Sequence, residues 1–258
     1  PFGYKLDDIV QGNQRELTIH FITPETSYAD SEIVAQSMGK DELRVFLGRD
    51  KRLLADLRLL LKTEKYTKQR TNSGALPSTQ AILQSKQVLN AEREKELIER
   101  LRQAVGKAQL IINAAEIPSS SQDAVTRVSD GFQELVSRTY TNLGLLGDKM
   151  YPEQQVAGVV QNDQGLFSAG NLNVLTSPGT EMESWIITQT GLGEQVTIKK
   201  IAARFESKPY GWDLGSIEVV VGWLVGNSKV ALTVDANPVV RTEAAALIRN
   251  TAKQQHPA

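Results

Sequence analysis

The sequence predicts a mixed, helix-rich α/β protein in which a small sheet domain with a long helix precedes a winged-helix-like domain. Three observations carry this prediction. Strand-like and helix-like segments alternate near the N-terminus, a long helical segment follows them, and three helical segments precede a hairpin near the C-terminus. The composition changes near Gly144 to Gly147, so we expect an α/β domain with a long helical arm over 1–147 and the winged-helix-like domain over 148–258.

The composition limits the possible classes of protein. The chain has 258 residues, a net charge of −1 and no cysteine. Disulfides, thiolate metal sites and a cysteine nucleophile are therefore excluded, and a uniformly basic nucleic-acid-binding protein is disfavoured, although local basic patches remain open. Because neither a membrane-spanning segment nor a secretory signal is visible, we expect a cytoplasmic protein with no membrane contact. The first residue is Pro1 rather than Met, and we expect the chain to be cut from a longer polypeptide.

The N-terminal part reads as a βαβ unit. Leu17–Ile22 alternates with period two and predicts a strand, Ser27–Ser37 predicts a short helix, and Leu43–Leu47 predicts a second strand. Leucines at helical spacing then predict a helix from Lys51 to about Tyr66. Short connections between these elements favour a small sheet with parallel strands.

A long helix is the next predicted element. Thr71–Pro77 reads as a loop, and Ser78 as the N-cap of a helix from Thr79 to about Val105. Leu110–Ile112 predicts a third strand, and Gln122–Tyr140 a further helix. The residues expected on the buried face of that helix are Val125, Val128, Phe132, Leu135 and Val136.

The C-terminal part has the element order of a winged helix-turn-helix module. A short helix (Pro152–Gln161) and a polar loop through Ser168–Asn171 come first. The predicted helices that follow are Thr180–Thr190, Val196–Ser207 and Leu214–Val225. Lys229–Val234 and Val239–Val240 then flank a turn at Asp235–Pro238. Three helices followed by a β-ribbon are typical of the winged helix.

No nucleotide-binding motif is present in this chain. A P-loop needs glycines at a fixed spacing followed by Lys and a hydroxyl residue, which together hold the phosphates and magnesium. Gly144–Lys149 has the wrong spacing, and Met150 stands where the hydroxyl residue is needed. Gly191-Leu192-Gly193 is a lone Gly-x-Gly, which we interpret as a turn.

No catalytic or metal-binding cluster is predicted either. We expect His20, beside Thr18 on the polar side of its strand, to be a surface or hydrogen-bonded histidine, and His256 to lie in a polar tail. The carboxylate pairs Asp7-Asp8 and Asp41-Glu42 read as solvated surface groups, because adjacency in sequence does not bring two carboxylates together in space. The sequence therefore predicts neither a catalytic residue nor a bound metal or cofactor in this chain.

Basic residues over 49–70 give a first candidate for nucleic-acid binding. Eight cations stand there against three carboxylates: Arg49, Lys51, Arg52, Arg58, Lys62, Lys65, Lys68 and Arg70. A helix that carries such residues can follow a phosphate backbone, and the candidates for direct contact are Arg52, Arg58, Lys62 and Lys65. The alternative is a solvated helix face whose last lysines favour the helix dipole.

The second candidate is the middle helix of the predicted winged-helix module, with Lys199, Lys200, Arg204 and Lys208. The last three are spaced by four, which places them on one helix face, as in a helix that docks into a DNA groove. Winged-helix modules also bind proteins or form lids of ATPases, so these roles remain open. Pro209–Trp212 predicts a sharp turn at Gly211 with two packed aromatic residues.

Three segments, in this order and spacing, resemble a known family. Pro1–Asp8, Leu61–Tyr66 and Pro209–Trp212 are similar to segments of the large P-loop ATPase of bacteriophage exclusion (BREX) systems, the BrxC/PglY family. The resemblance covers essentially the whole chain. It implies a bacterial, cytoplasmic, multi-domain ATPase of the AAA+ type that acts with other BREX components in phage exclusion and host DNA methylation.

The resemblance also explains the missing active site. This chain corresponds to a region downstream of the nucleotide-binding core, so ATP and Mg²⁺ are expected to bind in the preceding part. We therefore expect a non-catalytic, DNA-associated interaction region, with other BREX components, double-stranded DNA and a second copy of the chain as candidate partners. The alternatives are a structural scaffold or oligomerisation region without nucleic-acid contact and, less favoured, an enzyme with an unrecognised carboxylate site.

Overall fold

The computed structural model describes residues 2–71, 76–147, 149–161 and 172–253. Residues 72–75 of the predicted loop at Thr71–Pro77, the loop at Ser168–Asn171 and His256 lie outside these ranges. The chain divides into two compact units between Val136 and Ser137. The domain limit after residue 147 stays a prediction.

The first unit is built on a six-stranded mixed sheet with the order β2-β1-β3-β4-β5-β6. Its strands are β1 (Gly3–Leu6), β2 (Ile9–Gln11), β3 (Thr18–Ile22), β4 (Glu42–Phe46), β5 (Gln109–Ile112) and β6 (Ala115–Ile117). Strands β1, β3 and β4 run parallel, whereas β2, β5 and β6 are antiparallel to their neighbours. The predicted βαβ unit is confirmed, because α1 (Asp30–Ala35) connects β3 to β4.

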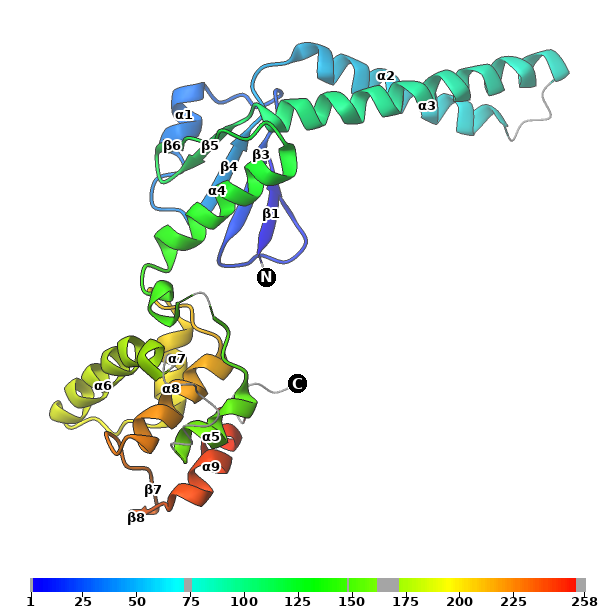
Figure 1. Cartoon of the computed structure of the whole chain (residues 1–258). Coiled ribbons are helices and arrows are strands. Elements are labelled where there is room, and N and C mark those ends of the chain that lie inside the picture. The colour runs from blue at the N-terminus through cyan, green and yellow to red at the C-terminus, as the bar shows by residue number, and fades with distance from the viewer. Residues whose placement is uncertain (1, 72–75, 148, 162–171, 254–258) are drawn as a thin grey trace. The chain divides into compact units, whose positions relative to one another are not determined.

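Helices cover both faces of this sheet (Figure 1). Ile33 of α1 packs in one cluster with Ile22, Phe46 and Ile111. On the other face, α4 (Ala124–Thr139) lies so close that a Cβ on Gly131 would be about 3.0 Å from a methyl of Leu110. The central strands are therefore buried on both sides.

The predicted buried face of α4 is only partly right. Leu135 is buried, and Val128, Phe132 and Val136 are half-buried, as the helical spacing indicates. Val125 is 75% exposed, so its prediction was wrong. It stands in the first turn of α4 and lines an open cavity of about 440 Å³ together with Val105, Val128 and Phe132, so its side chain is left uncovered.

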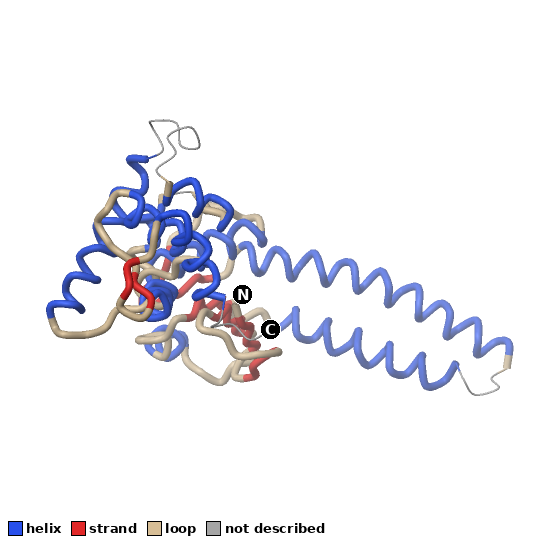
Figure 2. The backbone as a smooth tube through the Cα atoms, turned by 90° about the horizontal axis from the view of Figure 1, so that it is seen from below, coloured by secondary structure: helices blue, strands red, loops and turns tan. Residues whose placement is uncertain are grey.

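A long helical hairpin extends from the sheet, and we refer to α2 (Lys51–Thr71) together with α3 (Pro77–Gly106) as the arm (Figure 2). Both predicted helices are confirmed. The predicted N-cap was wrong, because α3 begins at Pro77 with Leu76 at the N-cap position. Proline suits the first helical turn, where an amide N–H has no helical partner to lose.

The two helices of the arm meet along a seam with seven-residue spacing, which we refer to as the arm seam. Its positions are Leu53, Leu60 and Thr67 on α2, and Leu83, Asn90 and Leu97 on α3. Asn90 Nδ2 donates a hydrogen bond to the carbonyl oxygen of Leu60 at 3.2 Å. A seven-residue repeat is typical of coiled coils, and a buried Asn in such a repeat fixes the register of the pair.

The second unit is a helical module closed by a short hairpin. Its elements are η1 (Leu143–Leu146), η2 (Glu153–Gln155), α5 (Val156–Val160), η3 (Leu172–Leu175), α6 (Thr176–Gly191), α7 (Ile198–Glu206), α8 (Leu214–Gly226), β7 (Thr233–Val234), β8 (Asn237–Pro238) and α9 (Arg241–Lys253). The predicted order of three helices and a hairpin is confirmed. Asp235 and Ala236 join β7 to β8 with φ of +50° and +64°, as a two-residue hairpin turn requires. Helix α9 was not predicted.

Helix α8 is the core of this unit, since every residue from Ser216 to Gly226 is buried. Its N-terminus is capped by Asp213, whose Oδ1 accepts a hydrogen bond from the backbone N–H of Ser216 at 3.0 Å. Next to it, the predicted turn at Pro209–Trp212 is confirmed. The rings of Tyr210 and Trp212 lie 4.5 and 4.8 Å from the ring of Phe205.

The close approach of α8 to α5 leads to a first prediction. A Cβ on Gly226 would lie 2.3 Å from the carbonyl oxygen of Val159, which is backbone and cannot rotate away. We expect Gly226→Ala to destabilise the second unit by about 1–3 kcal/mol, because the helices must separate. Tryptophan fluorescence during urea unfolding measures this, because all three tryptophans belong to this unit. Gly191→Ala, where the Cβ meets open space, is the control, and equal stability of the two variants would contradict this account.

Candidate functional site

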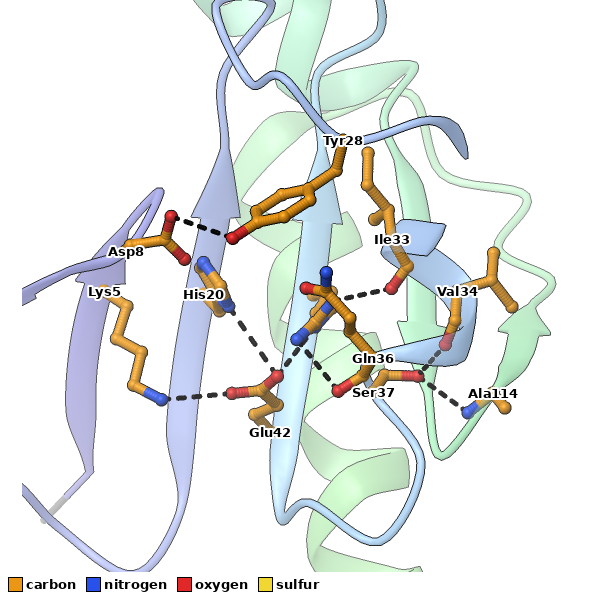
Figure 3. Close-up of polar contacts among 11 residues, drawn as sticks. Lys5, Asp8, His20, Tyr28, Ile33, Val34, Gln36, Ser37, Glu42 and Ala114 are labelled. Carbon is orange, nitrogen blue, oxygen red and sulfur yellow. Dashed lines mark hydrogen bonds and ion pairs between the residues drawn. The ribbon is translucent and has the colours of Figure 1, made fainter. Parts of the chain in front are cut away.

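A buried ionic network occupies the face of the sheet that α1 covers (Figure 3). Lys5, His20 and Arg44 stand side by side on β1, β3 and β4 in the strand register. Glu42 lies at the centre of the network: its Oε1 is 2.7 Å from Arg44 Nε, and its Oε2 is 3.3 Å from Lys5 Nζ. His20 Nδ1 lies 3.7 Å from Glu42 Oε1, beyond hydrogen-bond distance.

Arg44 also joins the sheet to α1. Its Nη1 donates to the carbonyl oxygen of Ile33 at 2.6 Å, and its Nη2 donates to that of Gln36 at 3.0 Å. Both carbonyls stand near the C-terminal end of α1, where a cation is favoured by the helix dipole. The guanidinium is 2% exposed, so these contacts replace its hydration.

The sequence-based interpretation of Glu42 was wrong, and of the two alternatives for His20 the surface position is excluded. Glu42 is 2% exposed rather than a solvated carboxylate, and His20 is 7% exposed rather than at the surface. The reason is that helix α1 packs over this face of the sheet. It buries the side of β3 that the alternation of polar and apolar residues marked as polar. Polar residues stand directly across from one another on the neighbouring strands, as Lys5, His20 and Arg44 do, and this pattern indicates a buried polar network. The pattern becomes visible only once the pairing of the strands is known.

The electrostatics of Glu42 limit what the network can do chemically. Burial opposes ionisation, but the contacts with His20 and Arg44 outweigh it and lower the pKa of Glu42 from 4.5 to about 2. A carboxylate held in this state is a poor proton acceptor near neutral pH. The adjoining cavity, lined by Asp7, Asp8 and Tyr28 among others, measures about 10 Å³, which suits one water molecule rather than a substrate. The network therefore holds the fold together.

The described residues contain no group of three His, Asp or Glu side chains that could hold a metal ion. Asp7, of the first carboxylate pair, instead accepts hydrogen bonds from the backbone N–H and the hydroxyl of Thr23, both at 2.8 Å. It thus ties the end of β1 to the end of β3. No helix among the described residues has both the length and the apolar character needed to cross a membrane.

The cations of α2 form a row on its outer face, opposite the arm seam. Helix α2 carries seven cations and two carboxylates. Lys51, Arg58 and Lys65 repeat at the same seven-residue spacing as the seam residues. Each stands two residues before a seam residue, which places it on the opposite side of the helix, and Lys62 lies beside them. We refer to these four residues as the cation row. The structure therefore brings three of the four candidates of this segment together.

The partners of these cations are few and exposed. Arg58 forms an ion pair with Glu25 and stays 64% exposed, whereas Lys62 and Lys65 are exposed. Arg52 lies nearer the seam, where its Nε is 3.9 Å from Asp56 Oδ2. Exposed ion pairs of this kind contribute little, so the cations remain available to a polyanion. Arg49, in contrast, precedes the helix and binds Asp30 and the carbonyl oxygen of Thr26.

The cations of the second candidate helix do not form the predicted single face. Helix α7 ends at Glu206 and Ser207 is extended, so Lys208 lies beyond the helix and outside its periodicity. Lys199 and Lys200 are exposed, and Lys200 Nζ is 2.7 Å from Glu194 Oε2. The guanidinium of Arg204 lies over the ring of Tyr210, 5.1 Å from its centroid. Lys200 and Arg204 are therefore already engaged within the unit.

The third helix of the module cannot read DNA in this structure. In helix-turn-helix proteins the recognition helix enters the major groove with exposed side chains. Here the helix at that position, α8, is buried from Ser216 onward and carries one charged residue, Glu218, which is 1% exposed. Groove reading by α8 would require the unit to unfold.

The fold and the site together define a chain that joins a six-stranded α/β module to a winged-helix module. Residues 1–135, more than half of the chain, match the family model described as the BREX ATP-binding protein BrxC 4th domain with six-stranded beta sheet. Residues 153–257 match the BREX ATP-binding protein BrxC winged helix-turn-helix domain. The chain therefore belongs to the BrxC family of BREX ATP-binding proteins, which confirms the resemblance. The search of solved structures found no match.

The buried carboxylate gives a second prediction. Because the pKa of Glu42 is lowered from 4.5 to about 2, its contribution to stability is present above pH 4.5 and is lost as the pH falls toward 2. We expect this group to contribute about 3 kcal/mol, and Glu42→Gln to remove it at pH 7 by leaving Arg44 buried without its carboxylate.

Far-UV circular dichroism during urea unfolding at pH 7 and at pH 3 measures this effect. Glu92→Gln, on the exposed surface of α3, is the matched control. Equal stability of Glu42→Gln and Glu92→Gln at pH 7 would show that the network does not hold the sheet.

Proposed function

We propose that this chain is a non-catalytic interaction region of a BREX ATP-binding protein and that the cation row of α2 contacts the phosphate backbone of double-stranded DNA. The observation that carries the proposal is the alignment of Lys51, Arg58, Lys62 and Lys65 on the outer face of one helix. Helix α2 has a surplus of five positive charges in a chain whose net charge is −1. This positive charge is concentrated on one element, as expected of a local electrostatic footprint.

The geometry supports backbone contact rather than base reading. A helix of 21 residues is about 31 Å long, so the cation row offers charges about 10 Å apart along a straight line. Such a row can neutralise phosphates without entering a groove, and this type of contact carries no sequence information. The burial of α8 favours the same conclusion, because the helix that usually reads bases is enclosed.

The cation row is a better candidate than α7. Lys200 and Arg204 of α7 are held by Glu194 and Tyr210, so binding DNA there would first break these contacts. Lys62 and Lys65 need no such rearrangement. We further propose that ATP and Mg²⁺ bind elsewhere in the longer protein, and that the assembly acts with other BREX components in phage exclusion.

The DNA proposal is tested by charge reversal. We expect the affinity for a DNA duplex to fall steeply with salt, with a slope of about −3 to −4 for four phosphate contacts. Lys62→Glu combined with Lys65→Glu should abolish binding, measured by fluorescence anisotropy. Lys199→Glu combined with Lys200→Glu is the matched control and should leave most of the affinity. Loss of binding instead in the Lys200→Glu, Arg204→Glu, Lys208→Glu variant would place the contact on α7.

The non-catalytic part of the proposal has its own test. We expect the chain to release no phosphate from ATP above the buffer blank in the presence of Mg²⁺, because no P-loop is present in its sequence. A steady-state phosphate-release assay measures this. Turnover that survives further purification would contradict the proposal.

A second candidate function is a scaffold without nucleic-acid contact. It is favoured by the number of apolar side chains that the arm exposes, among them Leu59, Tyr66, Ile82 and Leu89. Duplex binding that is absent or insensitive to salt would favour this alternative.

A further inference from the structure

One side of the arm carries an apolar stripe along its outer half. Leu59 and Tyr66 on α2 are 48% and 55% exposed, and Ile82 and Leu89 on α3 are 61% and 48% exposed. Each of these residues immediately precedes a residue of the arm seam: Leu60, Thr67, Leu83 and Asn90 respectively. We refer to the four exposed residues as the apolar stripe.

The seven-residue repeat places the four side chains together. In an antiparallel pair of helices, the positions just before the seam residues lie on the same side of both helices. A groove on this side is lined by Arg52 and Asp56 of α2 and by Leu89, Glu92, Arg93, Glu96, Leu97 and Arg100 of α3, which agrees with this placement. The opposite side has a separate groove, lined by Glu64 and Lys68 of α2 and by Gln87 and Glu94 of α3.

We propose that the apolar stripe binds an acidic amphipathic helix of a partner protein, which packs along α2 and α3 as the third helix of a bundle. The arm resembles such a bundle with one helix missing, because each of its helices buries only one residue in every seven. Two of these buried residues, Thr67 and Asn90, are polar. Apolar side chains at intervals of seven on each of two adjacent helices fit a partner helix with apolar residues at i, i+3 or i+4, and i+7.

The charge around the stripe selects the partner's chemistry. From residue 59 to residue 90 the chain has five cations and one carboxylate, Glu64. That carboxylate lines the groove on the opposite side and is bonded to Lys68. Nearer the sheet, the groove beside Leu89 carries the carboxylates Asp56, Glu92 and Glu96 together with three arginines, Arg52, Arg93 and Arg100, so the positive surplus lies along the outer half of the arm. Near the stripe stand Lys62, Lys86 and Arg70, the last with its guanidinium over the ring of Tyr66, 5.7 Å from the centroid. Glutamates on the flanks of a docked helix would meet these cations.

The same charges disfavour the other occupants. Two copies of the arm packed stripe to stripe would bring the same cations face to face, which destabilises the contact. A DNA backbone would gain from Lys62 but nothing from four apolar side chains. Lys62 lies between this surface and the outer face that carries Arg58 and Lys65. The Leu59→Gln, Leu89→Gln variant leaves every residue of the cation row unchanged, so it tests the stripe proposal by itself.

The test uses a synthetic helix as the probe. A peptide of about 21 residues with Leu at positions a and d and Glu at positions e and g of each heptad is labelled and titrated with the chain in an anisotropy experiment. We expect binding to weaken at least about tenfold in Leu59→Gln with Leu89→Gln, because two leucines lose apolar burial. Val88→Gln, 61% exposed on α3 but outside the stripe, is the matched control and should bind as the unmodified chain does.

Three outcomes would overturn the proposal. The first is equal binding of a peptide with Lys in place of Glu, since the charge argument would then fail. The second is unchanged binding of the acidic peptide by the Leu59→Gln, Leu89→Gln variant. The third is self-association of the unmodified chain in sedimentation that this variant loses, since a second copy would then cover the stripe. None of these outcomes depends on DNA binding, which Lys62→Glu with Lys65→Glu tests separately.

Discussion

The ion pair between Arg44 and Glu42 is the contact on which the first unit depends. The guanidinium joins a strand, its neighbouring carboxylate and two carbonyl oxygens at the end of α1. A buried charge that loses its partner is costly, so sheet and helix are stable only together. His20 and Arg44 together lower the pKa of Glu42 to about 2, which makes this carboxylate a poor proton acceptor near neutral pH. The polar centre of the sheet is therefore part of the framework, and surfaces for binding lie elsewhere in the unit.

The arm offers surfaces for binding because only one seam of buried side chains lies between its two helices. A two-helix hairpin has one seam, and the remaining positions of both helices are left to solvent. In α2 the positions opposite the seam carry cations, and the positions beside the seam carry Leu59 and Tyr66. One helix thus supports two surfaces of different chemistry, one suited to phosphates and one to an apolar, acidic helix. Asn90, bonded to the carbonyl oxygen of Leu60, sets the register that brings Leu89 level with Leu59.

The winged-helix unit shows that element order and DNA reading are separable. Its three helices and hairpin match the family model of the BrxC winged helix-turn-helix domain. The helix that would enter a groove is instead the centre of the core, where Gly226 lets it approach the carbonyl oxygen of Val159. An enclosed helix of this kind stabilises the unit but presents no side chains to a ligand.

The sequence by itself determined the order of the predicted helices and strands, the absence of a P-loop and the identity of the α2 cations, because periodicity, glycine spacing and charge are local properties. It also carried the family resemblance. It did not reveal the short strands β1, β2 and β6 or helix α9. Only the tertiary structure decided which faces are covered. His20 and Glu42 are buried because α1 adds a second layer over the sheet. Val125 is exposed because it lines an open cavity. Lys208 leaves the face of Lys200 because α7 ends before it. The periodicity of a strand or helix separates a polar face from an apolar face. Which face meets solvent depends on segments that are distant in sequence.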